Sequence, residues 1–141
     1  MTTPFSSPAA MPQTLAVTRG RVALSALWIT QIALAGMFML AGAMKFAGSP
    51  EMVGLFDAIG VGQWFRYLTG AIEVTAGAAL LVPSLAPFGA LVLVPTMAGA
   101  VATHLFIVGG SAAAPVVLLI GSLAVAWARR DQLVGAWSRL H

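Results

Sequence analysis

The sequence contains no cysteine among its 141 residues. This absence excludes disulfide bonds, thiolate nucleophiles, iron–sulfur clusters and cysteine-ligated zinc as features of the chain. Any catalytic or redox role must therefore rest on other side chains or on a bound molecule.

Charged residues are also scarce, at 8% of the chain, against roughly 25% in soluble domains. No basic stripe with interleaved aromatic residues is present, which argues against nucleic-acid binding. The two histidines, His104 and His141, lie far apart in the sequence, so no metal site is predicted. Haem iron needs only one axial histidine, but haem is the less favoured cofactor because no further haem motif accompanies His104.

Hydrophobic residues make up 60% of the chain. They gather in four runs at about 22–46, 66–82, 87–108 and 112–128. Runs of this length cross a bilayer as helices, which satisfy their own backbone hydrogen bonds in lipid. The sequence therefore predicts an all-α integral membrane protein, with the four helices packed as a bundle.

The segment between the first two runs has a different pattern. Ser49, Pro50 and Glu51 form a typical helix start, with a capping hydroxyl, a proline in the first turn and an acid near the helix N-terminus. Apolar residues then recur at the helical spacing i, i+3, i+4, i+7, up to Gly60 (Met52, Leu55, Phe56 and Ile59). This pattern predicts a short amphipathic helix at about 50–59 that lies in the membrane interface.

The charges outside the apolar runs predict the topology. Residues 1–20 are rich in Pro, Ser, Thr and Ala and are predicted to be a disordered tail, and residues 21–130 to be the membrane domain. Residues 131–141 are predicted to be a second short tail, in which an interfacial helix over 132–141 is the alternative. The two end segments hold five arginines, at positions 19, 21, 129, 130 and 139, whereas the opposite side mixes both signs (Lys45, Arg66, Glu51 and Asp57). The positive-inside rule therefore places both termini in the cytoplasm.

Ionisable residues inside the apolar runs are the candidate functional groups, because burying them in lipid costs at least about 2.5 kcal/mol each on the insertion scale. They are Glu73 in the second run, His104 in the third and Lys45 at the end of the first. Helical side chains lean toward the helix N-terminus, so in the predicted topology all three lean toward one level of the bundle. We take them as candidate catalytic residues, and Gln31 and Thr103 as candidate cofactor-binding residues.

Each candidate also has a structural interpretation. Glu73 can form an ion pair or hydrogen bond that only holds helices together, and His104 can serve as a hydrogen-bond partner of Glu73 or of a threonine. Lys45 can snorkel to the membrane interface. Gln31 can join two helices through a hydrogen bond.

Several short stretches at these positions resemble one family. The stretches are Gly42-Ala43-Met44-Lys45-Phe46, Gly70-Ala71-Ile72-Glu73, Leu80-Leu81-Val82-Pro83 and the segment from Met97 to His104. In this order and spacing, residues 22–130 resemble the DoxX-like family of bacterial membrane proteins. The resemblance implies a four-helix membrane bundle, a bacterial inner-membrane location and a link to redox physiology. Relatives include a DoxD-type subunit of a thiosulfate:quinone oxidoreductase, and DoxX proteins described as partners in membrane oxidoreductase complexes.

Three functions fit these features. The first is a redox-associated subunit that binds a quinone-type ligand near Glu73 and His104, with other membrane redox proteins as partners. The second is a non-catalytic assembly protein, in which the polar residues only set helix register. The third is a small transporter or proton-conducting protein, formed as a homo-oligomer through small-residue helix faces. Only some of these functions make the chain itself an enzyme.

Overall fold

The computed structural model describes residues 13–138, all of whose regular elements are helical. The predicted all-α class is thereby confirmed. The elements are α1 (Gln13–Ala47), α2 (Pro50–Ile59), α3 (Gln63–Leu80), α4 (Ala86–Thr103), the π-helical turn η1 (His104–Val108), α5 (Ala113–Ala128) and α6 (Arg130–Ser138). Residues 1–12 and 139–141, which include Arg139 and His141, lie outside the described part.

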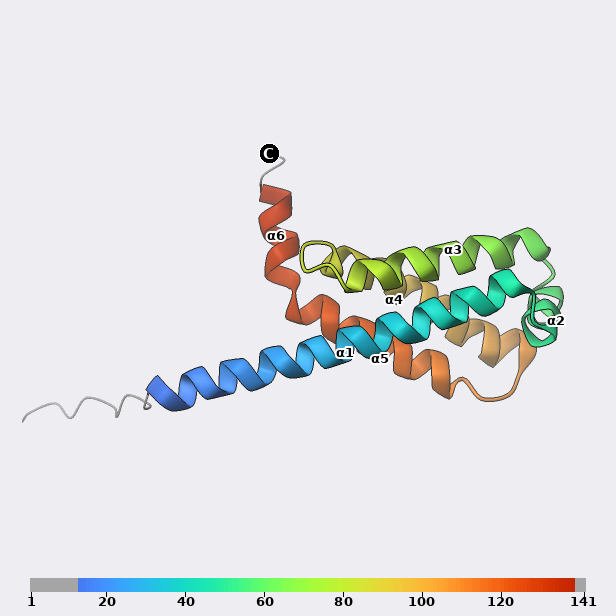
Figure 1. The fold of residues 1–141 in the computed structure, drawn as a ribbon. Helices are drawn as coiled ribbons and strands as arrows, with labels where there is room; N and C mark the ends of the chain where they lie inside the picture. The colour runs from blue at the N-terminus through green and yellow to red at the C-terminus, as the bar shows by residue number, and fades with distance from the viewer. Residues whose placement is uncertain (1–12, 139–141) are drawn as a thin grey trace, which may run out of the picture.

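Helices α1, α3, α4 and α5 lie side by side (Figure 1). Helix α1 packs on α3 and α5, and α4 packs on α3 and α5. The short helix α2 covers one end of this group, where it contacts α1, α3 and η1. At the other end α6 turns away from α5 by 53°. The group therefore has an α2 end and an α6 end, and the site described below lies at the α2 end.

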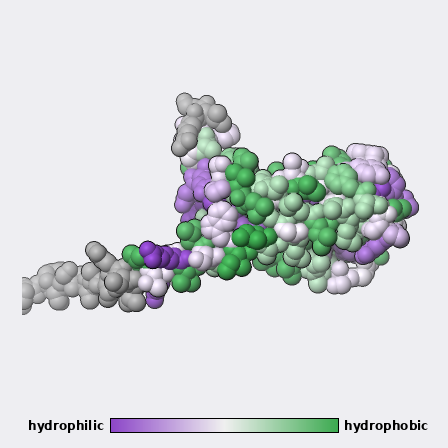
Figure 2. Space-filling model, in the orientation of Figure 1, coloured by the Kyte–Doolittle hydropathy of each residue, from purple (hydrophilic) through white to green (hydrophobic). Residues whose placement is uncertain are grey.

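The apolar surface fits a lipid environment. Figure 2 shows hydrophobic residues over the middle of the molecule, with hydrophilic residues at the α2 end and near the first turns of α1. Within residues 13–138, two segments are long and apolar enough to cross a membrane, Val17–Ala47 and Ala86–Val108, and α5 with α6 would make a third only as one bent span. Helix α3 carries Arg66 and Glu73 and does not qualify by composition. The four-span arrangement therefore stays a prediction.

The first and last helices begin and end differently from the predicted spans. Helix α1 begins at Gln13, so residues 13–20, which were expected to be disordered, are helical. Gly20 does not end the helix, because one glycine costs a helix only about 1 kcal/mol. After Arg129 the chain forms α6 up to Ser138, where the sequence also predicted a short helix as an alternative to a tail.

Helix α2 has the predicted bounds, Pro50 to Ile59. Gly60 ends it in the left-handed conformation, at φ 78°, and its N–H donates to the carbonyl of Phe56. The expected capping role of Ser49 is wrong, because its hydroxyl makes no cap hydrogen bond and is buried without a partner in the described part of the chain. Pro50 removes one of the unpaired backbone donors of the first turn, because it has no N–H.

Candidate functional site

A cavity of about 750 Å³ lies at the α2 end, between α2 and the walls formed by α1, α3, α4 and α5. Most of its wall is apolar, and much of it comes from α4, which contributes residues from Leu91 to Thr103. The apolar face of α2 forms another side (Met52, Leu55, Phe56 and Ile59). The periodic pattern of α2 was expected to bury this face in the membrane interface, but all four residues line the cavity.

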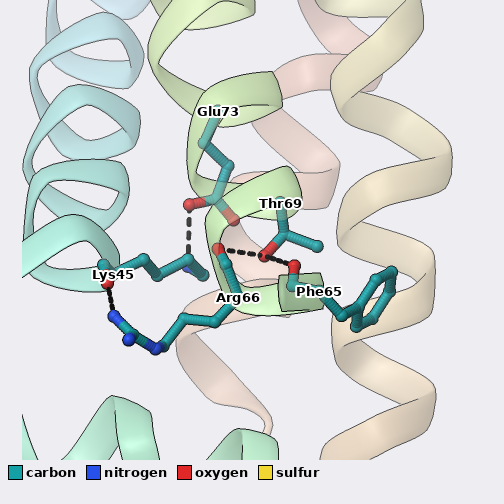
Figure 3. A network of polar contacts seen from close by, with 5 residues as sticks. All are labelled: Lys45, Phe65, Arg66, Thr69 and Glu73. Atoms are coloured by element: carbon teal, nitrogen blue, oxygen red, sulfur yellow. Dashed lines mark hydrogen bonds and ion pairs between the residues drawn. The ribbon is translucent and has the colours of Figure 1, made fainter. Parts of the chain in front are cut away.

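A buried ion pair lies in this cavity. The Nζ atom of Lys45 donates to Oε2 of Glu73 over 2.7 Å, and the two side chains are 12% and 4% exposed. Both residues line the cavity, and Figure 3 shows the lysine reaching from α1 to the carboxylate on α3. Lys45 therefore does not snorkel to solvent. Its ammonium group has three N–H donors, which leaves donors for a bound molecule.

Close approach of α1 and α3 makes this pair possible. A Cβ atom on Gly42 would lie 2.8 Å from the carbonyl oxygen of Gly70, and one on Gly70 would lie 3.1 Å from Cβ of Lys45. Larger residues at either position would push the two helices apart. The two glycines thus let the side chain of Lys45 cross directly to Glu73, which lies one helical turn beyond Gly70.

Arg66 is a further member of the site, and the sequence analysis treated it only as a flanking charge. It is buried, at 4% exposure. Its Nη1 atom donates to the backbone carbonyl of Lys45, its Nε atom donates to Oε1 of Gln63 over 2.6 Å, and its guanidinium lies 4.3 Å from the ring centroid of Tyr67. Arg66, Gly70 and Glu73 follow the i, i+4, i+7 spacing of one helix face. That spacing is the signal that could have grouped Arg66 with Glu73 in advance.

The threonines of the cavity are bonded to their own helices. Oγ1 of Thr69 donates toward the carbonyls of Phe65 and Arg66, at 3.0 and 3.1 Å, and Oγ1 of Thr103 donates to the carbonyl of Gly99 over 2.9 Å. A hydroxyl whose proton is used in this way keeps lone pairs that accept hydrogen bonds. Thr69 and Thr103, which both line the cavity, can therefore accept a hydrogen bond from a bound molecule.

His104 lines the same cavity from the first residue of η1. Its Nδ1 atom is buried and has no hydrogen-bond partner within residues 13–138. The expectation that His104 bonds to Glu73 or to a threonine is wrong, because no such bond is formed in this part of the chain. A buried polar atom without a partner costs about 1–3 kcal/mol. The Nδ1 atom is therefore a natural contact for a ligand that brings its own polar group.

Gln31 lies outside the cavity, and this corrects its grouping with the cofactor-binding candidates. Its Nε2 atom donates to the carbonyl of Leu80 over 2.6 Å, and its Oε1 atom accepts from Nε of Arg129 over 2.8 Å. All of its polar groups thus join α1 to the ends of α3 and α5. This geometry agrees with the other interpretation of Gln31, in which its side chain joins two helices through a hydrogen bond.

The structure thus brings four of the five sequence candidates to one cavity: Lys45, Glu73, Thr103 and His104. Among residues 13–138 no group of three or more His, Cys, Asp and Glu side chains is arranged to hold a metal ion. Chemically, the cavity offers cationic N–H donors, a carboxylate, hydroxyl oxygens and an imidazole inside apolar walls.

Comparison with known proteins gives one match. The model of the DoxX-like family matches residues 29–128. No curated protein and no solved structure matches the chain significantly. The matched range covers every residue that lines the cavity, including Lys45, Glu73 and His104.

Proposed function

The chain belongs to the DoxX-like family, and on this premise we propose that it binds a quinone-type ligand in its cavity and acts as a subunit of a membrane redox complex. The observation that carries the proposal is the set of polar groups inside an apolar cavity: the Lys45–Glu73 pair and the Nδ1 atom of His104, which has no partner within residues 13–138. The volume of about 750 Å³ lies within the range of roughly 300–1,000 Å³ that is usual for small-molecule pockets.

Hydrogen-bonding capacity supports a quinone over a plain acyl chain. A quinone headgroup has carbonyl oxygens that need donors, and Lys45 has N–H groups beyond the one used on Glu73. The reduced form has hydroxyl groups that need acceptors, which Glu73, Thr69 and Thr103 supply. An acyl chain needs neither donors nor acceptors. The cavity can therefore satisfy both redox forms, while its apolar walls suit the ring and the isoprenoid tail.

Proton transfer is the chemistry that these residues can add. Interconversion of quinone and hydroquinone moves two protons together with two electrons. Glu73, Lys45 and His104 are titratable groups that line the cavity, so each can exchange a proton with the headgroup. In this proposal the electrons come from a partner protein, and the chain contributes binding and proton exchange.

The experiment is a ligand analysis with matched variants. The protein is purified in mild detergent, its visible spectrum is recorded, and extracted molecules are identified by mass spectrometry, for wild type, Glu73→Gln and His104→Leu. The Glu51→Gln variant is the control, because Glu51 is an exposed carboxylate of α2 that does not line the cavity. We expect a stoichiometric quinone in wild type and in the control, and its loss in the two cavity variants.

Other results of this experiment would favour a different function or a different ligand. A colourless protein that holds only bulk lipid in every variant, and that does not bind added decylubiquinone, would refute the ligand proposal. The assembly function would then be favoured, because the Lys45–Glu73 pair also joins α1 to α3 without any ligand. A Soret band lost in His104→Leu would indicate haem instead.

We also propose that both termini face the cytoplasm of a bacterial inner membrane. The charges of the two ends support this orientation. Arg19, Arg21 and Arg130 are exposed near the α6 end, whereas the α2 end exposes Glu51 and Asp57. Reporter fusions at each terminus and within the loop after η1 test it. We expect cytoplasmic reporters to be active at both termini and periplasmic reporters to be active only in the loop; the reverse pattern would overturn the orientation.

A further inference from the structure

Arg66 occupies an unusual position, at the junction of α1, α2 and α3. Its side chain is buried, yet no ion pair within residues 13–138 involves it. The guanidinium is held instead by two neutral acceptors, the carbonyl of Lys45 and the amide of Gln63, and by the face of Tyr67. A buried cation without a carboxylate is expensive for a fold. One acceptor is the carbonyl of Lys45 at the end of α1, and the other is Gln63, which contacts α2. Arg66 therefore joins two parts of the site.

The first contact, from Arg66 to the backbone carbonyl of Lys45, acts on the main chain of that lysine. Lys45 lies in the last turn of α1, and its backbone carbonyl accepts a hydrogen bond from the N–H of Gly48, just beyond the helix, over 3.3 Å. Arg66 donates to this carbonyl, and a cation at a helix C-terminus is also favoured by the helix dipole. The contact fixes the backbone from which the lysine side chain extends to Glu73 (Figure 3).

The second contact acts on α2 through Gln63. Because Oε1 of Gln63 accepts from Arg66, the amide nitrogen of the same side chain is turned toward α2. There Nε2 donates to the carbonyl of Val53 over 3.0 Å and to Oδ1 of Asp57 over 2.7 Å. These bonds hold the helix whose apolar face closes the cavity. Arg66 and Gln63 therefore connect α2 to the backbone of Lys45 by consecutive hydrogen bonds, and the side chain of Lys45 extends from there to Glu73.

We infer that Arg66 is a positioning residue that couples the seating of α2 over the cavity to the placement of Lys45 against Glu73. When α2 is seated, Gln63 and Arg66 are ordered, and Lys45 is held where it meets a ligand. When α2 moves away, Gln63 loses its acceptors and the guanidinium loses its orientation. The significance for ligand binding rests on the proposed function, but the coupling itself can be measured without a ligand.

The absence of cysteine makes the measurement direct, because a single introduced thiol is the only labelling site. We choose Leu55→Cys, on the cavity face of α2, and follow maleimide labelling in detergent for the otherwise wild-type chain, for Arg66→Lys and for Gln63→Leu. Lysine keeps the charge but cannot donate in two directions from a planar group. Gln63→Leu keeps the Arg66 side chain but removes both the bonds to α2 and the acceptor of Arg66 Nε. Loss of a hydrogen bond to a charged group should raise the labelling rate about tenfold.

Two control cysteines separate a local effect from general loosening. Val125→Cys, at a fully buried position of α5, should stay unlabelled in every background. Gly54→Cys, at an exposed position of α2 with nothing within 4 Å of an added Cβ, should label at one rate throughout. Unchanged labelling of Leu55→Cys in both variants would overturn the inference. So would parallel increases at Leu55→Cys and Val125→Cys, which indicate a merely structural residue.

Ligand binding gives the second readout. With decylubiquinone as the probe, Arg66→Lys should weaken binding about tenfold, and Gln63→Leu should do the same. Unchanged affinity in both variants would contradict the link to Lys45. If the wild-type chain binds no decylubiquinone while Leu55→Cys labelling still responds to Arg66→Lys, the coupling stands and the proposed function fails. The two ideas are therefore tested separately.

Discussion

Oε1 of Gln31 accepts a hydrogen bond from Nε of Arg129 over 2.8 Å, although 98 positions separate the two residues. Both side chains are buried, and Gln31 also bonds to the carbonyl of Leu80. The contact joins α1, α3 and the α5–α6 junction at the end opposite α2. The chain thus places buried polar groups at both ends of its helix group, with different partners.

Replacing Gln31 tests the role of this second cluster. In Gln31→Leu the guanidinium of Arg129 and the carbonyl of Leu80 lose their partner, so we expect a loss of about 1–3 kcal/mol in the free energy of unfolding. Denaturant unfolding in detergent measures it, with Ser25→Ala on an exposed part of α1 as the control. Decylubiquinone affinity should not change, because Gln31 does not line the cavity. A selective loss of decylubiquinone affinity in a stably folded Gln31→Leu variant would show that Gln31 belongs to the binding site after all.

The Lys45–Glu73 pair should behave as a coupled unit. Glu73→Gln leaves a buried ammonium without a carboxylate, and Lys45→Met leaves a buried carboxylate without a cation. Each single change should cost about 3–5 kcal/mol of unfolding free energy, whereas the double change should cost clearly less than the sum. A double-mutant cycle of unfolding free energies measures the coupling. Additive losses would mean that the two charges are solvated independently.

The close approach of α1 and α3 predicts a steric effect at Gly42. An added Cβ there would lie 2.5 Å from Cγ2 of Val74 and 2.8 Å from the carbonyl of Gly70, so Gly42→Ala should cost about 1–3 kcal/mol by overpacking. Gly36→Ala on the same helix is the matched control, because nothing lies within 4 Å of its Cβ position. The control should be neutral or stabilising by up to about 1 kcal/mol, through helix propensity. Equal melting temperatures for the two variants would contradict the packing described for this crossing.

Filling the cavity should block ligand binding without unfolding the chain. Gly99 lines the cavity and has nothing within 4 Å of an added Cβ, so Gly99→Leu places its side chain into open space. We expect decylubiquinone binding to fall at least about tenfold while the melting temperature is retained. Gly36→Leu, also in open space but outside the cavity, should bind normally. Normal binding by Gly99→Leu would place the ligand elsewhere.

Local sequence patterns were sufficient for α2 and for the all-α class, but not for the start of α1. The bounds of α2 follow from Pro50 at its start and Gly60 at its end, both of which act on their own backbone. The all-α class follows from apolar runs that need internal hydrogen bonds. Glu73 and Lys45 were found because a charge within an apolar run requires a partner wherever the run is buried.

Contacts between helices were decided only by the tertiary structure. Whether Gln31 faces a ligand or Arg129 depends on how α1 is rotated against α5, and no spacing within α1 specifies that rotation. The apolar face of α2 suits a membrane interface and a cavity equally well, because both are nonpolar environments. Within residues 13–138, Nδ1 of His104 lacks a hydrogen-bond partner and the guanidinium of Arg66 has two acceptors, because of where the ends of α1, α2 and α4 meet. The sequence determines which residues need partners, while the packing of the helices decides which partners they receive.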